Sequence, residues 1–335
     1  CLAALCDEPG LDALLVIFIP PLVTPSTEIA RVVGEVLAAR PALDRTVTAV
    51  FLDPQAHLTT ITAGARHVPV YEFPESAVAA LAAAARYGVW RNTPAGNYPS
   101  VNIDRAALDT VLNENGAGWL SQDACAKLLG SVGIHIIQPQ IAGSANEAAT
   151  IAQTLNRPLA LKIHEPAILH KTDVGGVLLN IAPAEAAAAY DKLAAQLAAH
   201  GIALAAASLT PMAAPGVEML AGVTHDPVFG PLVACGSGGV LVELLNDIAF
   251  RVLPLTDADA AALVRGTRAW RLLQGYRGGA AADVAALESL LLALGALAEA
   301  APRIAEIDLN PVIVHPAGEG LSLIDARVRL TTALV

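Results

Sequence analysis

The chain has 335 residues, enough for two domains with separate cores. A net charge of −11 and an aromatic content of 4% argue against a basic or base-stacking surface for nucleic acid. Although 55% of the residues are hydrophobic and the mean hydropathy is +0.54, Pro20, Pro21, Glu288 and Glu299 interrupt the apolar runs. None approaches the roughly 20 apolar residues that span a bilayer, so we expect no membrane or nucleic-acid partner.

The four cysteines, Cys1, Cys6, Cys125 and Cys235, form no Cys-x-x-Cys pair. This usage favours a reducing compartment without a disulfide framework, and we expect a cytoplasmic protein. No signal peptide is visible, and the chain begins with Cys1 rather than Met. We therefore expect a processed or excised piece of a longer protein.

The first third of the sequence alternates apolar runs with helical patterns. It predicts strands at 11–21, 46–54 and 67–73, helices at 24–41 and 74–90, and a short helix between the second and third strands. Such alternation predicts an α/β domain with a parallel sheet and helices on both faces, entered almost directly from the N-terminus. A stretch rich in Pro, Gly and Asn (91–102) marks the boundary. We expect a first domain at 1–92, a linker at 93–108 and a second domain at 109–335.

The second domain is expected to mix strands and helices. Helices are predicted at 121–134, 144–158, 183–200, 256–273 and 280–300, the second with Ser144 and Glu147 as a capping box. Strands are predicted at 135–142, 159–163, 177–181 and 203–212, in the segment 216–247, and at 304–316 and 321–330. The last two are expected to be antiparallel neighbours.

The segment "LALKIHEPAILHKTDVGGVLLNI" places many ionisable groups between two predicted strands. Lys162 lies in an otherwise buried strand, where an ammonium needs an anion; it either binds phosphate, pairs with a carboxylate or reaches solvent. Gly175 and Gly176 allow a hinge or a close approach of backbone N–H groups to an anion. His170 is a possible phosphoryl acceptor, although a lone loop histidine is more often a surface residue.

Near the C-terminus, "EIDLNP" and "LIDAR" place three oxygen donors on neighbouring predicted strands. Asp308 and Asn310 are two residues apart, so both side chains point to one face. With Asp325 they form a hard oxygen site suited to Mg²⁺, completed by phosphates and water. Together with Lys162 this outlines an ATP site, although each Asp alone is also explained as a turn or surface residue.

The motifs "HKTDVGGV" and "DLNP", with "PGVEMLAGVTHDPVFGPLVACGSGGVLVELLND" between them, resemble the ATP-grasp region of ADP-forming acyl-CoA synthetases. That family is similar to succinyl-CoA ligase and shares its architecture with Pat-type protein lysine acetyltransferases. The segments "LDALLVIFIPP" and "VPVYEFPESAVAALAAAARY" resemble the flavodoxin-like CoA-ligase domain that precedes it. The resemblance implies a flavodoxin-like parallel-sheet domain followed by an ATP-grasp domain of two α+β lobes.

The family converts acyl-CoA, phosphate and ADP to acid, CoA and ATP through a phosphohistidine. By resemblance, His170 is the phosphohistidine, Asp308 orients it or assists the metal, and Asn310 and Asp325 hold Mg²⁺. Nucleotide binding falls to Lys162, Lys171, Gly175, Gly176, Met212 and Glu218. The adenine is expected near "SLTPMA" (208–213), where Thr210 replaces the family's usual Gln.

Full-length relatives also carry a CoA-binding domain and a domain with the first relay histidine, and neither is visible here. The resemblance therefore implies that a missing N-terminal portion or a separate subunit supplies both, that a CoA thioester is substrate of the complete enzyme, and that the protein is oligomeric. The alternative is a regulatory region of a Pat-type acetyltransferase whose GNAT domain lies outside this chain. A third reading, a biotin-carboxylase-like ATP-grasp enzyme, fits the fold but not the "HKTDVGGV" loop.

Overall fold

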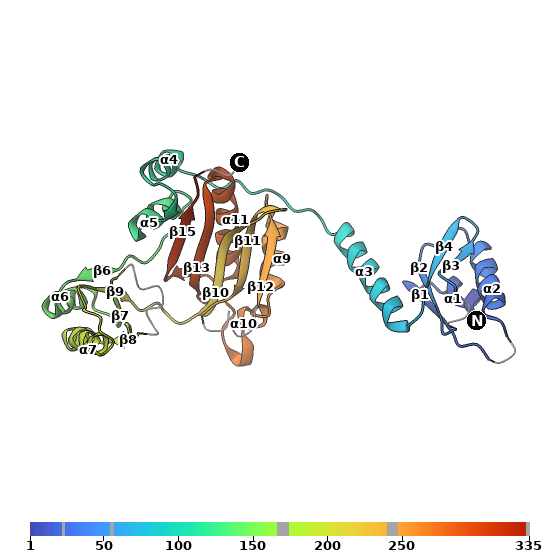
Figure 1. Ribbon diagram of the computed structural model, residues 1–335, viewed down its shortest axis with the longest axis horizontal. Helices are drawn as coiled ribbons and strands as arrows, with labels where there is room; N and C mark the ends of the chain where they lie inside the picture. Colours follow the sequence, from blue (N-terminus) through green and yellow to red (C-terminus); the bar gives the residue numbers. More distant parts are fainter. Residues whose placement is uncertain (22–23, 54–56, 166–173, 240–246, 333–335) are drawn as a thin grey trace. The chain divides into compact units, whose positions relative to one another are not determined.

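A computed structural model describes residues 1–335 except 22–23, 54–56, 166–173, 240–246 and 333–335 (Figure 1). The chain divides into two compact units, Cys1–Pro94 and Ala95–Val335. The first unit has one buried core and the second unit has two.

The first unit is an α/β domain built on a four-stranded sheet in the order β1-β2-β4-β3. Its elements are α1 (Leu2–Asp7), β1 (Ala13–Phe18), α2 (Ser26–Ala38), β2 (Thr46–Phe51), β3 (Thr60–Ala63), β4 (Arg66–Tyr71) and α3 (Pro74–Asn92). Strands β1, β2 and β4 are parallel, as predicted, whereas β3 pairs antiparallel with β4.

Helices cover both faces of this sheet, which confirms the prediction. Val47 and Phe51 of β2 belong to the core that includes Val33 of α2. Val50 of β2 points to the opposite face and is fully buried, as is Ala77 of α3, which packs on β2. The two-residue alternation of a strand therefore supplies one apolar side chain to each helix layer.

Two expectations for the first unit are wrong. The described residues between β2 and β4 hold strand β3 where a short helix was expected; β3 alternates exposed and buried side chains and joins β4 through a two-residue turn with Gly64 at φ +64°. The chain also does not enter β1 directly, because the helix α1 precedes it and buries Cys6 against the same core as α2.

The second unit contains a smaller, fully antiparallel sheet in the order β6-β9-β7-β8. Its elements are β6 (Gln140–Ala142), α6 (Ala145–Leu155), β7 (Leu159–Ile163), β8 (Val177–Ile181), the 3-10 turn η1 (Pro183–Glu185), α7 (Ala186–Ala199) and β9 (Ala207–Pro211). Helices α6 and α7 share one core with β7 and β9, so they cover one face of the sheet. Ala160, Ser208 and Thr210 lie on the opposite face and are also buried.

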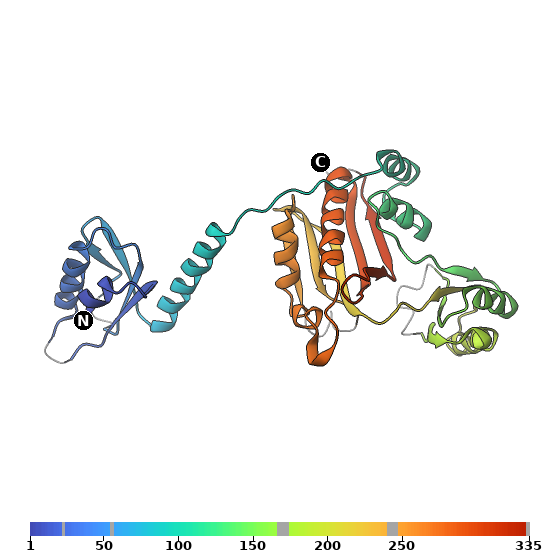
Figure 2. The same cartoon turned by 180° about the vertical axis from the view of Figure 1, so that it is seen from behind.

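The larger sheet of the second unit has the order β12-β11-β10-β13-β15-β5, with β14 paired to β13. Its strands are β5 (Gly118–Trp119), β10 (Val217–Asp226), β11 (Gly230–Ser237), β12 (Ile248–Val252), β13 (Ile304–Val314), β14 (Leu321–Leu323) and β15 (Ala326–Leu330). Its helices are α4 (Arg105–Glu114), α5 (Gln122–Gly130), α9 (Asp257–Arg265), α10 (Trp270–Leu273) and α11 (Val284–Ala300), with the 3-10 turn η2 (Tyr276–Gly278). Figure 2 shows α9 and α11 side by side over one face of this sheet.

Several boundaries in the second unit differ from the sequence prediction. The helix expected at 256–273 is broken into α9 and α10, and the strand expected at 321–330 is interrupted at 324–325, between β14 and β15. The helix α4 was not predicted. Ser144 caps α6 by accepting the Glu147 N–H at 3.2 Å, but the Glu147 carboxylate accepts the N–H of Gly143 rather than that of Ser144.

No described helix combines the length and the apolar character needed to cross a membrane.

The smaller sheet offers a matched test of its core. Leu161→Ala should destabilise this lobe by about 2–5 kcal/mol, because Leu161 is 1% exposed and its removal leaves a cavity. Leu179→Ala on the neighbouring strand should cost less than about 0.5 kcal/mol, because Leu179 is 56% exposed. Hydrogen exchange of the β9 amides measures the difference. Equal losses in the two variants would contradict the assignment of the buried face.

Candidate nucleotide-phosphate site

Lys162 lies on the face of the smaller sheet that is opposite α6 and α7. Leu161 and Ile163 are in the core with α6 and α7, so the side chain between them points to the opposite face, where it is half-buried. Ser208 of β9 is its cross-strand neighbour. Among the described residues, no carboxylate forms an ion pair with the Lys162 ammonium.

The glycine pair Gly175–Gly176 directly precedes β8. Gly175 has a φ of +65°, a left-handed conformation that favours glycine, and the Gly176 carbonyl accepts the Ile163 N–H at 2.9 Å. This bond fixes the end of the motif next to Lys162. His170 and Lys171 lie outside the described residues, so their predicted roles stay predictions.

Met212 follows β9 at the same sheet. Its backbone N–H donates to the Pro158 carbonyl at 2.8 Å, and its side chain is half-buried. Thr210, which stands in the position of the family's Gln, is buried within β9 opposite Ala160. The segment expected near the adenine thus belongs to the same sheet as Lys162.

Asp308 and Asn310 share the open face of the larger sheet, as their spacing predicted. Leu309 between them is fully buried in the core that includes α11, whereas both polar side chains are half-buried on the other face. The Asn310 Oδ1 accepts the backbone N–H of Gly239 at 3.1 Å. Since an amide oxygen has two lone pairs, Oδ1 keeps one for a further partner.

Glu218 and Asn310 both contact the glycine segment that follows β11. A Cβ built on Gly239 would come within 2.1 Å of the Glu218 Oε2, so the carboxylate rests directly against this glycine. The Gly238 N–H donates to the Glu218 carbonyl at 2.9 Å. The φ of +61° at Gly239, a left-handed conformation, favours glycine at this position.

Asp325 corrects one sequence expectation, because it lies not on a strand but in the interruption between β14 and β15. Its carboxylate accepts the N–H of the following Ala326 at 2.9 Å. Ala326 pairs with Leu309. Asp325 therefore directly precedes the residue that pairs with Leu309, which lies between Asp308 and Asn310.

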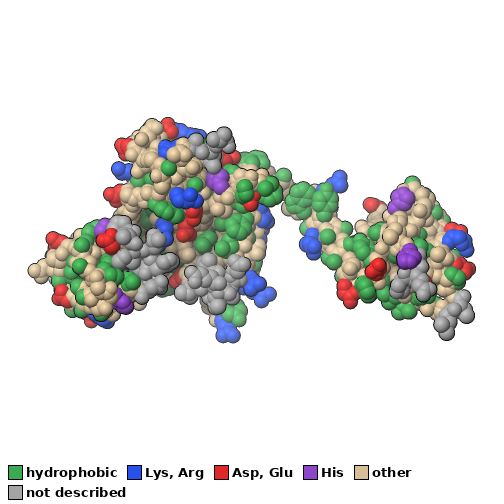
Figure 3. All heavy atoms as spheres, in the orientation of Figure 1, with side chains coloured by type: hydrophobic (Ala, Val, Ile, Leu, Met, Phe, Trp, Pro, Cys, Tyr) green, Lys and Arg blue, Asp and Glu red, His purple; other side chains and the backbone are tan. Residues whose placement is uncertain are grey.

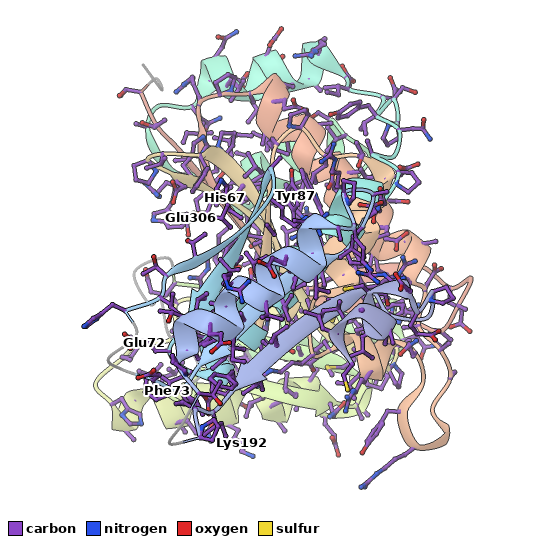
Figure 4. The ribbon with its side chains drawn as sticks, turned by 90° about the vertical axis from the view of Figure 1, so that its right-hand side faces the viewer. His67, Glu72, Phe73, Tyr87, Lys192 and Glu306 are labelled. Carbon is purple, nitrogen blue, oxygen red and sulfur yellow. The ribbon has the colours of Figure 1, made fainter. Side chains whose placement is uncertain are left out.

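The Asp308 carboxyl has a raised pKa. Burial is the main cause, the negative charges of Asp325 and Glu306 act in the same direction, and the positive charge of Arg327 opposes them. Arg327 is the cross-strand partner of Asp308 and was missed in the sequence analysis. Figure 3 shows acidic and basic side chains next to each other in the part of the molecule that holds β13 and β15. An ion pair at 3.1 Å joins Glu306 of β13, labelled in Figure 4, to Arg329 of β15.

The donor set fits a magnesium ion held jointly with a nucleotide. Two carboxylates and an amide oxygen are the hard ligands that Mg²⁺ takes, and Mg²⁺ usually keeps positions for phosphate and water. Among the described residues, no group of three His, Cys, Asp or Glu side chains could hold a metal ion.

Thiol chemistry does not explain the site. Burial raises the pKa of Cys125 to about 11 and that of Cys235 to about 12, so both thiols stay protonated near neutral pH. Two grooves of the described residues lie away from these side chains, one lined by Tyr98 and Leu292 and one by Arg40 and Asp44.

Comparison with known proteins identifies the class. Residues 111–330 match the family model of the ATP-grasp domain, and this chain belongs to that family. A relative described as the beta subunit of ADP-forming acetate–CoA ligase II from Pyrococcus furiosus is 33% identical over 227 residues, 67% of this chain and 96% of the relative. The chain thus carries the ATP-grasp portion of the ADP-forming acyl-CoA synthetase family, as its motifs indicated.

Two further matches agree. A trans-feruloyl-CoA synthase of an unknown prokaryotic organism is 38% identical over 216 residues, 63% of this chain and 30% of that protein. A solved structure of dinucleotide forming acetyl-coenzyme A synthetase 1 from Ca. Korarchaeum cryptofilum, with coenzyme A and Mg-AMPPCP and a phosphohistidine segment pointing towards the nucleotide site, is 35% identical with a TM-score of 0.56. The match covers 68% of this chain and all of that one.

The match to the feruloyl-CoA synthase spans less than a third of that protein's length. None of the relatives named here is an acetyltransferase, so the alternative of a Pat-type regulatory region finds no support.

The raised pKa of Asp308 gives a pH-dependent prediction. The protonated Asp308 carboxyl contributes to the free energy of unfolding. This contribution is fully present below the ordinary pKa of about 3.9 and is lost as the pH rises through the higher pKa of the folded state. Asp308→Asn should therefore raise the thermal unfolding midpoint at pH 7, and the gain should shrink towards pH 4. A variant less stable than the wild type at pH 7, or a gain independent of pH, would contradict this.

Proposed function

We propose that this chain transfers a phosphoryl group between His170 and ADP, as the nucleotide half of an ADP-forming acyl-CoA synthetase. The observation that carries the proposal is the placement of Glu218, Asp308, Asn310 and Asp325 around one open sheet face. The solved relative described with Mg-AMPPCP and a phosphohistidine segment supports it. The complete reaction would convert acyl-CoA, phosphate and ADP to acid, CoA and ATP.

In the proposed step, an oxygen of the ADP β-phosphate attacks the phosphorus on the His170 imidazole. The O–P bond forms as the N–P bond breaks, and the ring nitrogen recovers its electron pair. Lys162 would hold a phosphate oxygen, and Asp308 would orient the imidazole through its carboxyl. Bound Mg²⁺, held by Asn310 and Asp325, would neutralise charge on the phosphates.

The remaining nucleotide contacts follow from the same arrangement. The left-handed backbone of Gly175 and the anchored Gly176 would let the His170 segment turn without steric cost. Lys171 would bind phosphate beside it, Met212 would line the base pocket, and Glu218 would lie near the transferred group.

The acyl-CoA chemistry needs parts beyond this chain. A CoA-binding portion and the first relay histidine would come from another segment or subunit, in line with relatives described as beta subunits. The complete enzyme would be an oligomer in that case. The free thiols of all four cysteines suit the reducing conditions of the cytoplasm, where we propose that it acts.

Phosphorylation at His170 tests the proposal directly. Incubation with Mg²⁺ and ATP labelled at the γ-phosphate should yield an acid-labile, base-stable phosphoprotein, and His170→Asn should abolish it. His164→Asn is the matched control, because His164 is an exposed histidine at the end of β7 in the same motif. Labelling that survives His170→Asn, or no labelling of the wild type, would refute the phosphohistidine role.

Nucleotide binding tests Lys162. Lys162→Met should weaken MgADP binding by about 10- to 100-fold, the loss expected for a charge-assisted hydrogen bond worth about 1.5–3 kcal/mol. Lys192→Met should leave the affinity unchanged, because Lys192 is an exposed residue on α7 (Figure 4). Calorimetric titration measures both. An unchanged affinity for Lys162→Met would remove this lysine from the site.

A further inference from the structure

Asp247 is a buried carboxylate that the proposed reaction does not use. It is 6% exposed, yet three donors point at it: the Ser237 hydroxyl at 2.6 Å, the Arg268 N–H at 2.7 Å and the Ala269 N–H at 3.0 Å. Burial raises its pKa, but these donors and the Arg268 charge together hold the pKa below its usual value. The carboxylate is therefore charged, and both of its oxygens accept hydrogen bonds.

Asp247 ties the end of β11 to the turn before α10. The Ser237 backbone N–H also donates to the Asp247 carbonyl at 3.0 Å, so both the main chain and the side chain of Ser237 are bound to the same residue. Ser237 is itself only 3% exposed. The position of this serine is thus set by Asp247 and by the two amides at 268 and 269.

The residues after Ser237 reach the candidate site. The Gly238 N–H donates to the Glu218 carbonyl, and the Gly239 N–H donates to the Asn310 Oδ1. A Cβ at Gly238 would lie 2.6 Å from the Met219 carbonyl oxygen, so this segment is packed tightly against β10. A short path of hydrogen bonds and covalent links therefore runs from Asp247 through Ser237 to Asn310.

We propose that Asp247 is a positioning residue for the metal-binding amide: by fixing Ser237 it sets the Gly239 N–H, which orients the Asn310 side chain. The bond from Gly239 occupies one lone pair of Oδ1 and directs the other. The inference rests on the proposed function, since Asn310 is there a magnesium ligand. Asp247 touches neither nucleotide nor metal in this account.

Asp283 supplies a matched control. Its carboxylate also accepts three N–H groups, from Ala286, Gly318 and Gly320, and it caps α11. None of these three groups belongs to the Ser237–Gly239 segment. Asp247→Asn and Asp283→Asn should thus lose comparable local bonding, but only the first should disturb Asn310.

The first experiment needs no nucleotide. Hydrogen exchange of a peptide spanning the β11 end and Gly239 should speed up at least several-fold in Asp247→Asn and in Ser237→Ala, and remain at the wild-type rate in Asp283→Asn. Unchanged exchange in Asp247→Asn would overturn the positioning role, whether or not the proposed function is right.

The second experiment measures ADP affinity with and without Mg²⁺. Asp247→Asn should weaken MgADP binding about 10-fold and change metal-free ADP binding less than twofold, while Asp283→Asn leaves both within twofold of the wild type. Equal losses with and without Mg²⁺, or equal losses in both Asp variants, would show a merely structural role and overturn the proposal. Absence of nucleotide binding in the wild type would instead refute the proposed function, and hydrogen exchange alone would then decide on Asp247.

Discussion

The two-residue alternation of β7 and β13 is the constraint from which the chemistry of this chain follows. In each strand, one set of side chains points into a helix-covered core and the alternate set points to the opposite face of the sheet. Leu161 and Leu309 are therefore fixed by packing, and Lys162 and Asp308 are held in place by their neighbours. Holding polar side chains in one position on a strand costs conformational entropy. Burial of the apolar residues between them offsets that cost.

The larger sheet places like charges together at a cost in folding free energy. Asp308 is half-buried near Asp325 and Glu306; burial is the main cause of its raised pKa, the two carboxylates add to the rise, and Arg327 opposes it. Repulsion of this kind is relieved when a cation binds between the carboxylates, so it disfavours the empty site and favours the loaded one. A carboxyl whose pKa is perturbed by burial and by charged neighbours is often part of a functional site.

The sequence was sufficient to predict structural features that depend on local periodicity. The apolar run around Lys162 and the spacing of Asp308 and Asn310 predicted strands and shared faces correctly. Features set by tertiary contacts were missed: the break that leaves Asp325 between β14 and β15, the pairing of Arg327 with Asp308, and the network of Asp247. A strand register and a bond between residues 237 and 247 leave no trace in a short sequence window. The glycines of "CGSGGV" were the one sequence signal of the tight packing around Ser237, because a close approach of two backbones requires glycine.

The central claim is that side chains from both sheets of the second unit bind one nucleotide. A crystal structure with Mg²⁺ and a non-hydrolysable ATP analogue tests it most directly. We expect the Lys162 ammonium within hydrogen-bonding distance of a phosphate oxygen, and a metal ion shared by that polyphosphate, Asn310 and Asp325. A nucleotide bound with its phosphates against only one of the two sheets, and a metal ion away from Asn310, would contradict the account.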